Sequence, residues 1–112
     1  MPFNDLREFI DAARKLGQVK EIHGADWNIE IGALTEMFAL KEPSPLLLFD
    51  RIPGHAPNFR VASNLINTPG RSGLTVGMPA DAPPIELIAR WKELLKNVKP
   101  IPPRVVANGP IL

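Results

Sequence analysis

The sequence predicts an α+β domain, in which a small, mostly antiparallel sheet of at least three strands carries helices packed on it. Two observations predict this class. Helical and strand patterns follow one another as helix, strand, helix, strand, strand, short helix and helix, without an internal repeat. The chain has 112 residues, 45% hydrophobic and 22% charged, which suits one modest core.

The first helix is expected to follow a capping residue, Asn4 or Asp5, and to stop at Gly17. Its apolar residues recur at helical spacing and share one face: Leu6, Phe9, Ile10, Ala13 and Leu16. A short, half-buried strand is expected next, over residues 18–25, because apolar and polar residues alternate there.

A second helix is expected from about Ile29 to Leu40, capped by Asp26 or Asn28 and ended before Pro43. Ile29, Ala33, Met37 and Leu40 form one apolar stripe of this helix, and Leu34 and Phe38 lie beside it.

The continuous apolar run LLLF (46–49) is typical of a buried strand. A turn-rich loop over 51–58 follows, and alternation over 59–65 predicts another strand. Thr68 and Pro69 are a good N-cap and first helical residue for a short helix that ends at Gly77.

The last helix is expected over residues 84–98, and its apolar set includes Ile88 and Trp91. The stripes of these helices and the strands together predict the core. The expected core residues are Leu6, Phe9, Ile10, Leu16, Ile31 or Leu34, Met37, Leu47, Phe49, Val61, Ile88 and Trp91.

Composition excludes several classes of function. The net charge of +1 gives no electrostatic reason to expect nucleic acid or an anionic membrane as a partner. The absence of cysteine excludes disulfides, thiolate nucleophiles and cysteine-based zinc sites. The opening MPFNDLREFI does not read as a secretory signal and no apolar run is long enough to span a membrane, so a cytoplasmic protein is expected.

Few residues suggest a catalytic, cofactor-binding or metal-binding role. His23 and His55 lack the spacing of a zinc site. The stretch 70–73, which includes Arg71, could form an anion-binding nest, although a turn that feeds a helix is favoured. Glu30 and Glu36 lie on different helix faces and form no acid/base pair. We therefore predict no catalytic, cofactor-binding or metal-binding residue.

Three stretches in order carry a family resemblance: DLREFIDAARKLGQVKEI with IEIGALTE, then SPLLLFDRIPGH with FRVASNLINTPGR, then ELIARWKELLKNVKPIPPRVVANGPIL. Together they resemble the N-terminal domain of the UbiD family of decarboxylases. The resemblance implies a parent enzyme that uses prenylated FMN, with Mn2+ and K+, to decarboxylate aromatic or α,β-unsaturated acids reversibly. The family's catalytic Glu-Arg-Glu set, flavin ligands and metal ligands belong to a middle barrel domain and map onto no position here.

The resemblance also implies a division of the chain. Residues 1–98 would be the N-terminal α+β domain, and residues 99–112 a proline-rich, extended connector to a flavin-binding barrel. The barrel and a C-terminal domain of the same enzyme, in cis or as a separate chain, are the expected partners, in a homo-oligomer. Ile111 and Leu112 would then be covered by the next domain.

Two other functions stay open at this point. The chain could be a free-standing adaptor without enzymatic activity. It could also be a small metal- or anion-binding protein that uses His23, His55 and Arg71.

Overall fold

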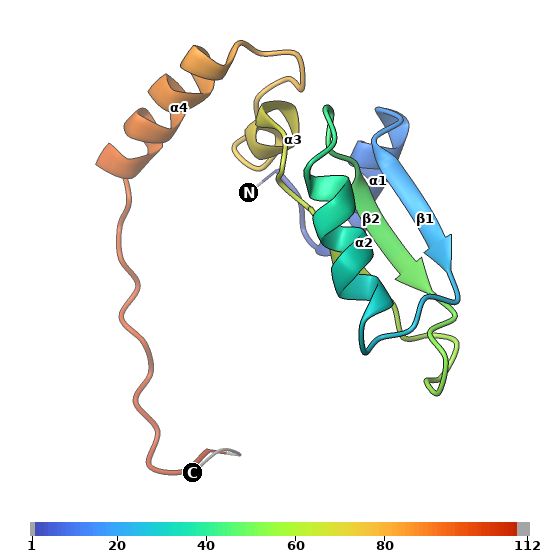
Figure 1. Ribbon diagram of the computed structural model, residues 1–112. Coiled ribbons are helices and arrows are strands. Elements are labelled where there is room, and N and C mark those ends of the chain that lie inside the picture. Colours follow the sequence, from blue (N-terminus) through green and yellow to red (C-terminus); the bar gives the residue numbers. More distant parts are fainter. Residues whose placement is uncertain (1, 110–112) are drawn as a thin grey trace.

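A three-stranded sheet forms the centre of the computed structural model, which describes residues 2–109 (Figure 1). Strands β1 (Val19–His23), β2 (Leu46–Asp50) and β3 (Val61–Ser63) are ordered β1-β2-β3. Helix α1 (Leu6–Lys15) packs on one face of the sheet and helix α2 (Glu30–Ala39) on the other. The α+β class and the strand number are thus confirmed.

The sheet is mixed, so the expectation of a mostly antiparallel sheet is wrong. β1 pairs with β2 in parallel, with Val19 opposite Leu46. β2 pairs with β3 antiparallel, with Phe49 opposite Val61. The physical reason is the order of elements: β1, α2 and β2 form a strand-helix-strand crossover, which joins parallel strands.

β2 is buried on both faces, which explains its uninterrupted apolar run. Leu46 and Leu48 belong to the core under α1, whereas Leu47 and Phe49 belong to the core under α2. The other buried members are Phe9, Ile10 and Ala13 in the first core, and Ala25 and Phe38 in the second.

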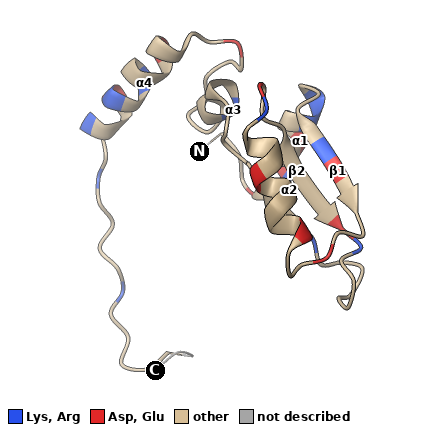
Figure 2. Cartoon of the chain, in the orientation of Figure 1, with Lys and Arg blue, Asp and Glu red and all other residues tan. Residues whose placement is uncertain are grey.

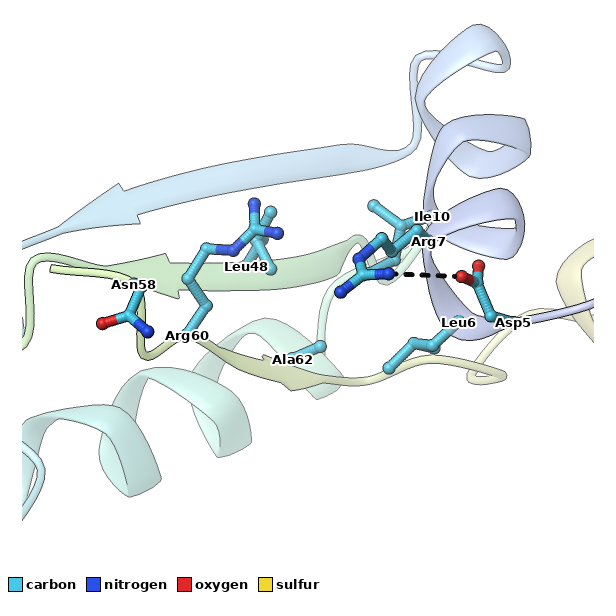
Figure 3. A pocket seen from close by; sticks show the side chains of 8 residues that line it. All are labelled: Asp5, Leu6, Arg7, Ile10, Leu48, Asn58, Arg60 and Ala62. Atoms are coloured by element: carbon cyan, nitrogen blue, oxygen red, sulfur yellow. Dashed lines mark hydrogen bonds and ion pairs between the residues drawn. The ribbon is translucent and has the colours of Figure 1, made fainter. Parts of the chain in front are cut away.

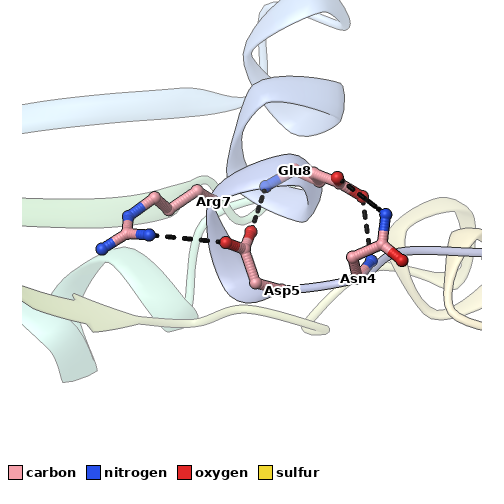
Figure 4. Close-up of polar contacts among 4 residues, drawn as sticks. All are labelled: Asn4, Asp5, Arg7 and Glu8. Carbon is pink, nitrogen blue, oxygen red and sulfur yellow. Dashed lines mark hydrogen bonds and ion pairs between the residues drawn. The ribbon is translucent and has the colours of Figure 1, made fainter.

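Helix α1 begins and ends as its sequence predicts. The Asp5 carboxylate accepts a hydrogen bond from the Glu8 backbone N–H at 3.0 Å, and Gly17 takes a φ of +69° just past the helix. The backbone N–H and the side-chain amide of Asn4 each donate to the Glu8 carboxylate at 2.9 Å (Figure 4). These bonds, the side-chain bond foremost, lower the pKa of Glu8.

Helix α2 buries only part of its expected core set. Phe38 is buried and Ile31 and Leu34 are partly buried, while Met37 and Leu40 are exposed. The expected cap is wrong as well, because the helix begins after Ile29 without a side-chain cap. α2 is apolar around most of its circumference, so helical spacing alone did not determine which side meets the sheet.

Helix α4 (Pro84–Lys96) has no buried residue and projects beyond the sheet from α3 (Pro69–Leu74) (Figure 1). The core prediction is therefore wrong for Ile88 and Trp91, which are 63% and 44% exposed. It is also wrong for residues at the margins of the small sheet, where three short strands cover only the middle of each stripe: Leu6, Leu16, Met37 and Val61.

Helix α3 starts as predicted, since the Thr68 side chain caps it and Pro69 occupies its first turn. It ends at Leu74 rather than Gly77. A Cβ atom at position 70 would lie 2.3 Å from the carbonyl oxygen of Ala80, so Gly70 permits a close approach of two backbones.

The remaining expectations concern connections and the tail. Residues 51–60 form a loop, and β3 is shorter than the predicted strand. Residues 97–109 form neither helix nor strand. The expectation for Ile111 and Leu112 falls outside the described residues. Across residues 2–109, none of the helices combines the length and apolarity needed to cross a bilayer.

Candidate functional site

Arg71 is the only charged side chain with no solvent exposure among the residues that the structure describes. Helix α3 directs it into the domain, where its Nε atom donates to the Leu65 carbonyl at 2.9 Å. One Nη atom donates to the Gln18 side chain at 2.9 Å. The other donates to the carbonyls of Ser44 and Asn64 at 2.7 and 3.0 Å.

These bonds make Arg71 an internal structural residue. Burial lowers the pKa of its guanidinium, and within residues 2–109 no carboxylate oxygen lies within 4.0 Å of it. Its donors are directed to the chain itself, so the side chain is not presented to an external anion. No sequence signal marks this role, because the four acceptors come from three separate segments.

The two histidines lie in different surroundings. The His23 ring contacts the Asp50 carboxylate, its cross-strand neighbour at the end of β1 and β2. His55 lies in the loop after β2 and lines an apolar groove. Among residues 2–109, no three histidine, aspartate or glutamate side chains gather as a metal site. The structure therefore does not combine His23, His55 and Arg71 into one site.

A groove of about 430 Å³ lies between α1 and β3, and the sequence did not reveal it (Figure 3). Ile10 and Leu48 contribute its apolar base. Arg7 reaches over this base from α1, and Arg60 reaches over it from the segment before β3. Arg7 also contacts the Asp5 carboxylate at 3.5 Å. The groove is therefore amphipathic, with two guanidinium groups at its rim.

A second groove, of about 500 Å³, is mainly apolar. Trp27 and Phe59, each 62% exposed, line it together with the buried side chain of Ile52. His55 and Arg60 are its polar members. Arg60 thus lines both grooves.

An exposed apolar stripe runs along α4 (the α4 stripe) and consists of Ile85, Ile88, Trp91 and Leu95. All four residues are exposed, and their spacing places them on one side of the helix. Basic residues gather toward the C-terminal end of α4 (Figure 2), where cations favour the helix dipole. An exposed apolar stripe of this kind is typical of an interaction surface.

A second apolar stripe lies on the outer side of α2. Ile29, Met37 and Leu40 share this side and are all exposed. A helix that is apolar on both sides is typical of a helix buried between two bodies. The domain therefore presents two helices whose apolar sides lack a cover among the described residues.

Comparison with known proteins identifies the family. The model of the 3-octaprenyl-4-hydroxybenzoate carboxy-lyase N-terminal domain matches residues 10–91, which is most of the chain. This match confirms the resemblance seen in the sequence.

Solved structures of vanillic acid decarboxylase from Sedimentibacter hydroxybenzoicus share the fold. The open form with truncated ShVdcD gives a TM-score of 0.78 at 23% identity. Another open form gives 0.72 at 24% identity, and a closed form gives 0.71 at 23%. Each similarity covers 93% of this chain but only 22% of the decarboxylase chain. The chain belongs to the UbiD family of carboxy-lyases and corresponds to the N-terminal domain of its members.

Proposed function

We propose that this chain is the non-catalytic N-terminal domain of a UbiD-family decarboxylase and that it docks onto the other domains of that enzyme. The observation that carries this proposal is the α4 stripe, which is exposed although apolar. The family match and the 22% coverage of the decarboxylase chains support it, because most of such an enzyme lies outside this domain.

The parent enzyme would decarboxylate aromatic or α,β-unsaturated carboxylic acids reversibly, with prenylated FMN, Mn2+ and K+. The side chains of residues 2–109 do not fit such a metal, because no cluster of three ligating residues exists among them. We therefore assign no metal to residues 2–109. The family resemblance implies that the flavin lies in the barrel domain, so we place no reaction step on this chain. The parent enzyme would be a cytoplasmic homo-oligomer.

Within this proposal, residues 1–98 form the domain and residues 99–112 connect it to the flavin-binding barrel. Pro100, Pro102 and Pro103 lack a backbone N–H and fix φ, which disfavours helix and central strand in this segment. Val105 and Val106 are exposed in the domain alone. Contact with the barrel would bury them together with the α4 stripe, and each Å² of apolar surface removed from water contributes roughly 25 cal/mol.

The test is binding between this chain and the flavin-binding and C-terminal domains of a UbiD-family decarboxylase from the same organism. We expect the two polypeptides to copurify when coexpressed. In a Trp27→Phe variant, which leaves Trp91 as the single indole of this chain, we expect the emission of Trp91 to shift to the blue as its indole leaves water. Serine substitution of both Ile88 and Trp91 should weaken the complex by at least about tenfold, because two apolar anchors are lost.

The control is Ile66→Ser, which removes a similarly exposed apolar side chain outside α4. It should leave binding unchanged. The proposal would be wrong if no complex forms, or if the α4 double variant binds as tightly as the control. Complex formation that leaves decarboxylation unaffected would favour the adaptor function instead.

A further inference from the structure

We propose that Asn108 is a site of spontaneous modification, at which the side-chain amide is lost and an aspartyl or isoaspartyl residue forms. The backbone nitrogen of Gly109 is the nucleophile, and water is the second reactant. This inference is independent of the proposed docking function, because it requires only an accessible Asn-Gly peptide in the 112-residue chain.

The sequence is the first step. Asn108 and Gly109 form the single Asn-Gly pair of the chain, since every other asparagine precedes a residue with a side chain. Asparagine is thermolabile because the backbone nitrogen of the next residue can attack its side-chain carbonyl carbon. Glycine favours this attack, because it has no Cβ to obstruct the approach and permits the backbone rotation that the approach needs.

The surroundings of the pair are the second step. Asn108 is exposed, and residues 97–109 form neither helix nor strand. Among residues 2–109, no group forms a hydrogen bond with the Asn108 side chain or with the backbone N–H of Gly109. Apart from the chain neighbours, no described atom lies within 4 Å of where a Cβ on Gly109 would be. The attacking nitrogen is therefore not held away from the Asn108 side chain.

Asn58 shows what restrains such a reaction elsewhere. It is exposed and lies in a loop, as Asn108 does. The backbone N–H of Phe59, however, donates to the Ala56 carbonyl at 3.0 Å. This hydrogen bond holds the nitrogen that would attack Asn58, and the Phe59 side chain obstructs its approach. Asn58 is therefore an internal control within the same chain.

The reaction consists of ring closure and ring opening. In ring closure, the Gly109 nitrogen bonds to the side-chain carbonyl carbon of Asn108, and the bond from that carbon to the amide nitrogen breaks. The amide nitrogen leaves as ammonia with the proton of the Gly109 N–H, and a succinimide remains. Water then opens this ring. Attack at the former side-chain carbonyl gives aspartate, and attack at the main-chain carbonyl gives isoaspartate.

Both products change the segment that contains the exposed Val105 and Val106. The new carboxylate lowers the formal net charge of the chain at pH 7 from +1 to zero. Isoaspartate also routes the backbone through its side-chain carbon, which adds a methylene to the main chain before Gly109.

The test incubates the folded 112-residue chain at mildly alkaline pH and follows each asparagine by peptide mapping with mass spectrometry. We expect Asn108 to be converted at least about tenfold faster than Asn58, with release of ammonia. Aspartate and isoaspartate should both form at position 108. Unfolding in guanidinium chloride should change the Asn108 rate by less than about twofold, because the fold does not restrain this peptide.

Gly109→Val should slow the conversion of Asn108 by at least about tenfold, because the branched side chain obstructs the attacking nitrogen. Ala107→Val is the matched control, since it adds the same side chain before Asn108 rather than after it. It should react at the rate of the parent chain. Far-UV circular dichroism checks that the variants fold.

Equal rates at Asn108 and Asn58 would overturn the proposal, and so would equal rates in Gly109→Val and Ala107→Val. Formation of aspartate without isoaspartate would show direct hydrolysis of the amide, which contradicts attack by the Gly109 nitrogen. Marked acceleration at Asn108 on unfolding would contradict the accessibility on which the proposal rests.

Discussion

The guanidinium of Arg71 donates to the backbone carbonyl of Ser44 at 2.7 Å, across 27 positions of sequence and without exposure to solvent. Through this bond and its bonds to Gln18, Asn64 and Leu65, one side chain connects the starts of β1 and β2 with the segment that leads into α3. Buried carbonyls need such donors, because an unsatisfied one costs free energy.

Arg71→Met should lower the free energy of unfolding by about 3 kcal/mol or more, because it removes the donors to three backbone carbonyls and one side-chain amide. Urea denaturation measures the loss. Arg90→Met, on the exposed face of α4, should change stability by less than about 0.5 kcal/mol. Similar stability of the two variants would show that the Arg71 bonds contribute little.

Local chemistry made several elements predictable. Asp5 and Gly17 delimit α1, and Thr68 with Pro69 starts α3, as the sequence indicates. These positions depend on hydrogen bonds and φ preferences within a few residues. Features that depend on contacts between distant segments were harder to predict from the sequence. The parallel pairing of β1 with β2 depends on the crossover through α2. The apolar run of β2 indicates burial on both faces but does not fix the direction of its neighbour.

The exposed apolar stripe and the grooves were predicted less well than the helix boundaries. The α4 stripe has the spacing of a core face, so periodicity placed Ile88 and Trp91 in the core. Periodicity reports that a face will be covered, but it does not say whether the cover belongs to the same domain. The groove between α1 and β3 could not be predicted, because Arg7 and Arg60 are distant in sequence and line it together only through the packing of α1 on the sheet.

A pair of variants on α1 tests which side of that helix is buried. Phe9 is 6% exposed and packs edge-on against Phe3, whereas Leu6 is 50% exposed. Phe9→Ala should therefore cost roughly 3–5 kcal/mol of unfolding free energy. Leu6→Ala should cost less than about 1 kcal/mol. Urea melts of both variants give the comparison, and a loss under about 1 kcal/mol for Phe9→Ala would mean that the core under α1 is misassigned.

Stability should depend on pH through Glu8. The bonds from Asn4 hold the pKa of Glu8 below its ordinary value of 4.5. A carboxyl group with a lowered folded pKa stabilises the fold above its unfolded pKa, and this contribution is lost as pH falls through the folded pKa. Unfolding free energy should therefore decline on acidification below about pH 4.5.

Glu8→Gln should reduce that acid-induced decline, measured by urea denaturation at a series of pH values. Asn4→Ala should act in the same way, because it removes the side-chain donor that lowers the Glu8 pKa. The double variant should then add little to either single change. Fully additive effects would show that the two side chains are not coupled.

The isolated chain should not decarboxylate. Its acidic residues offer no acid/base pair by spacing, and no metal-ligating cluster forms among residues 2–109. The assay supplies prenylated FMN, Mn2+ and K+ with a panel of aromatic and cinnamic-type acids and measures carbon dioxide. Turnover well above the buffer rate would contradict the non-catalytic role proposed for this domain.

Removal of residues 104–112 should leave the domain folded and reduce its self-association. Residues 104–108 are all exposed and form neither helix nor strand. Their loss therefore removes no buried contact with the sheet. Val105 and Val106 present apolar surface to solvent, and exposed apolar segments recruit partners. Hydrogen exchange should show unchanged protection of β2. Sedimentation should show fewer chains per particle for the truncated protein than for the full chain. Serine at both Val105 and Val106 in the full chain should reproduce the effect on sedimentation. If the truncated chain loses protection throughout β2, the tail is an integral part of this fold, and its role as a connector to another domain is wrong.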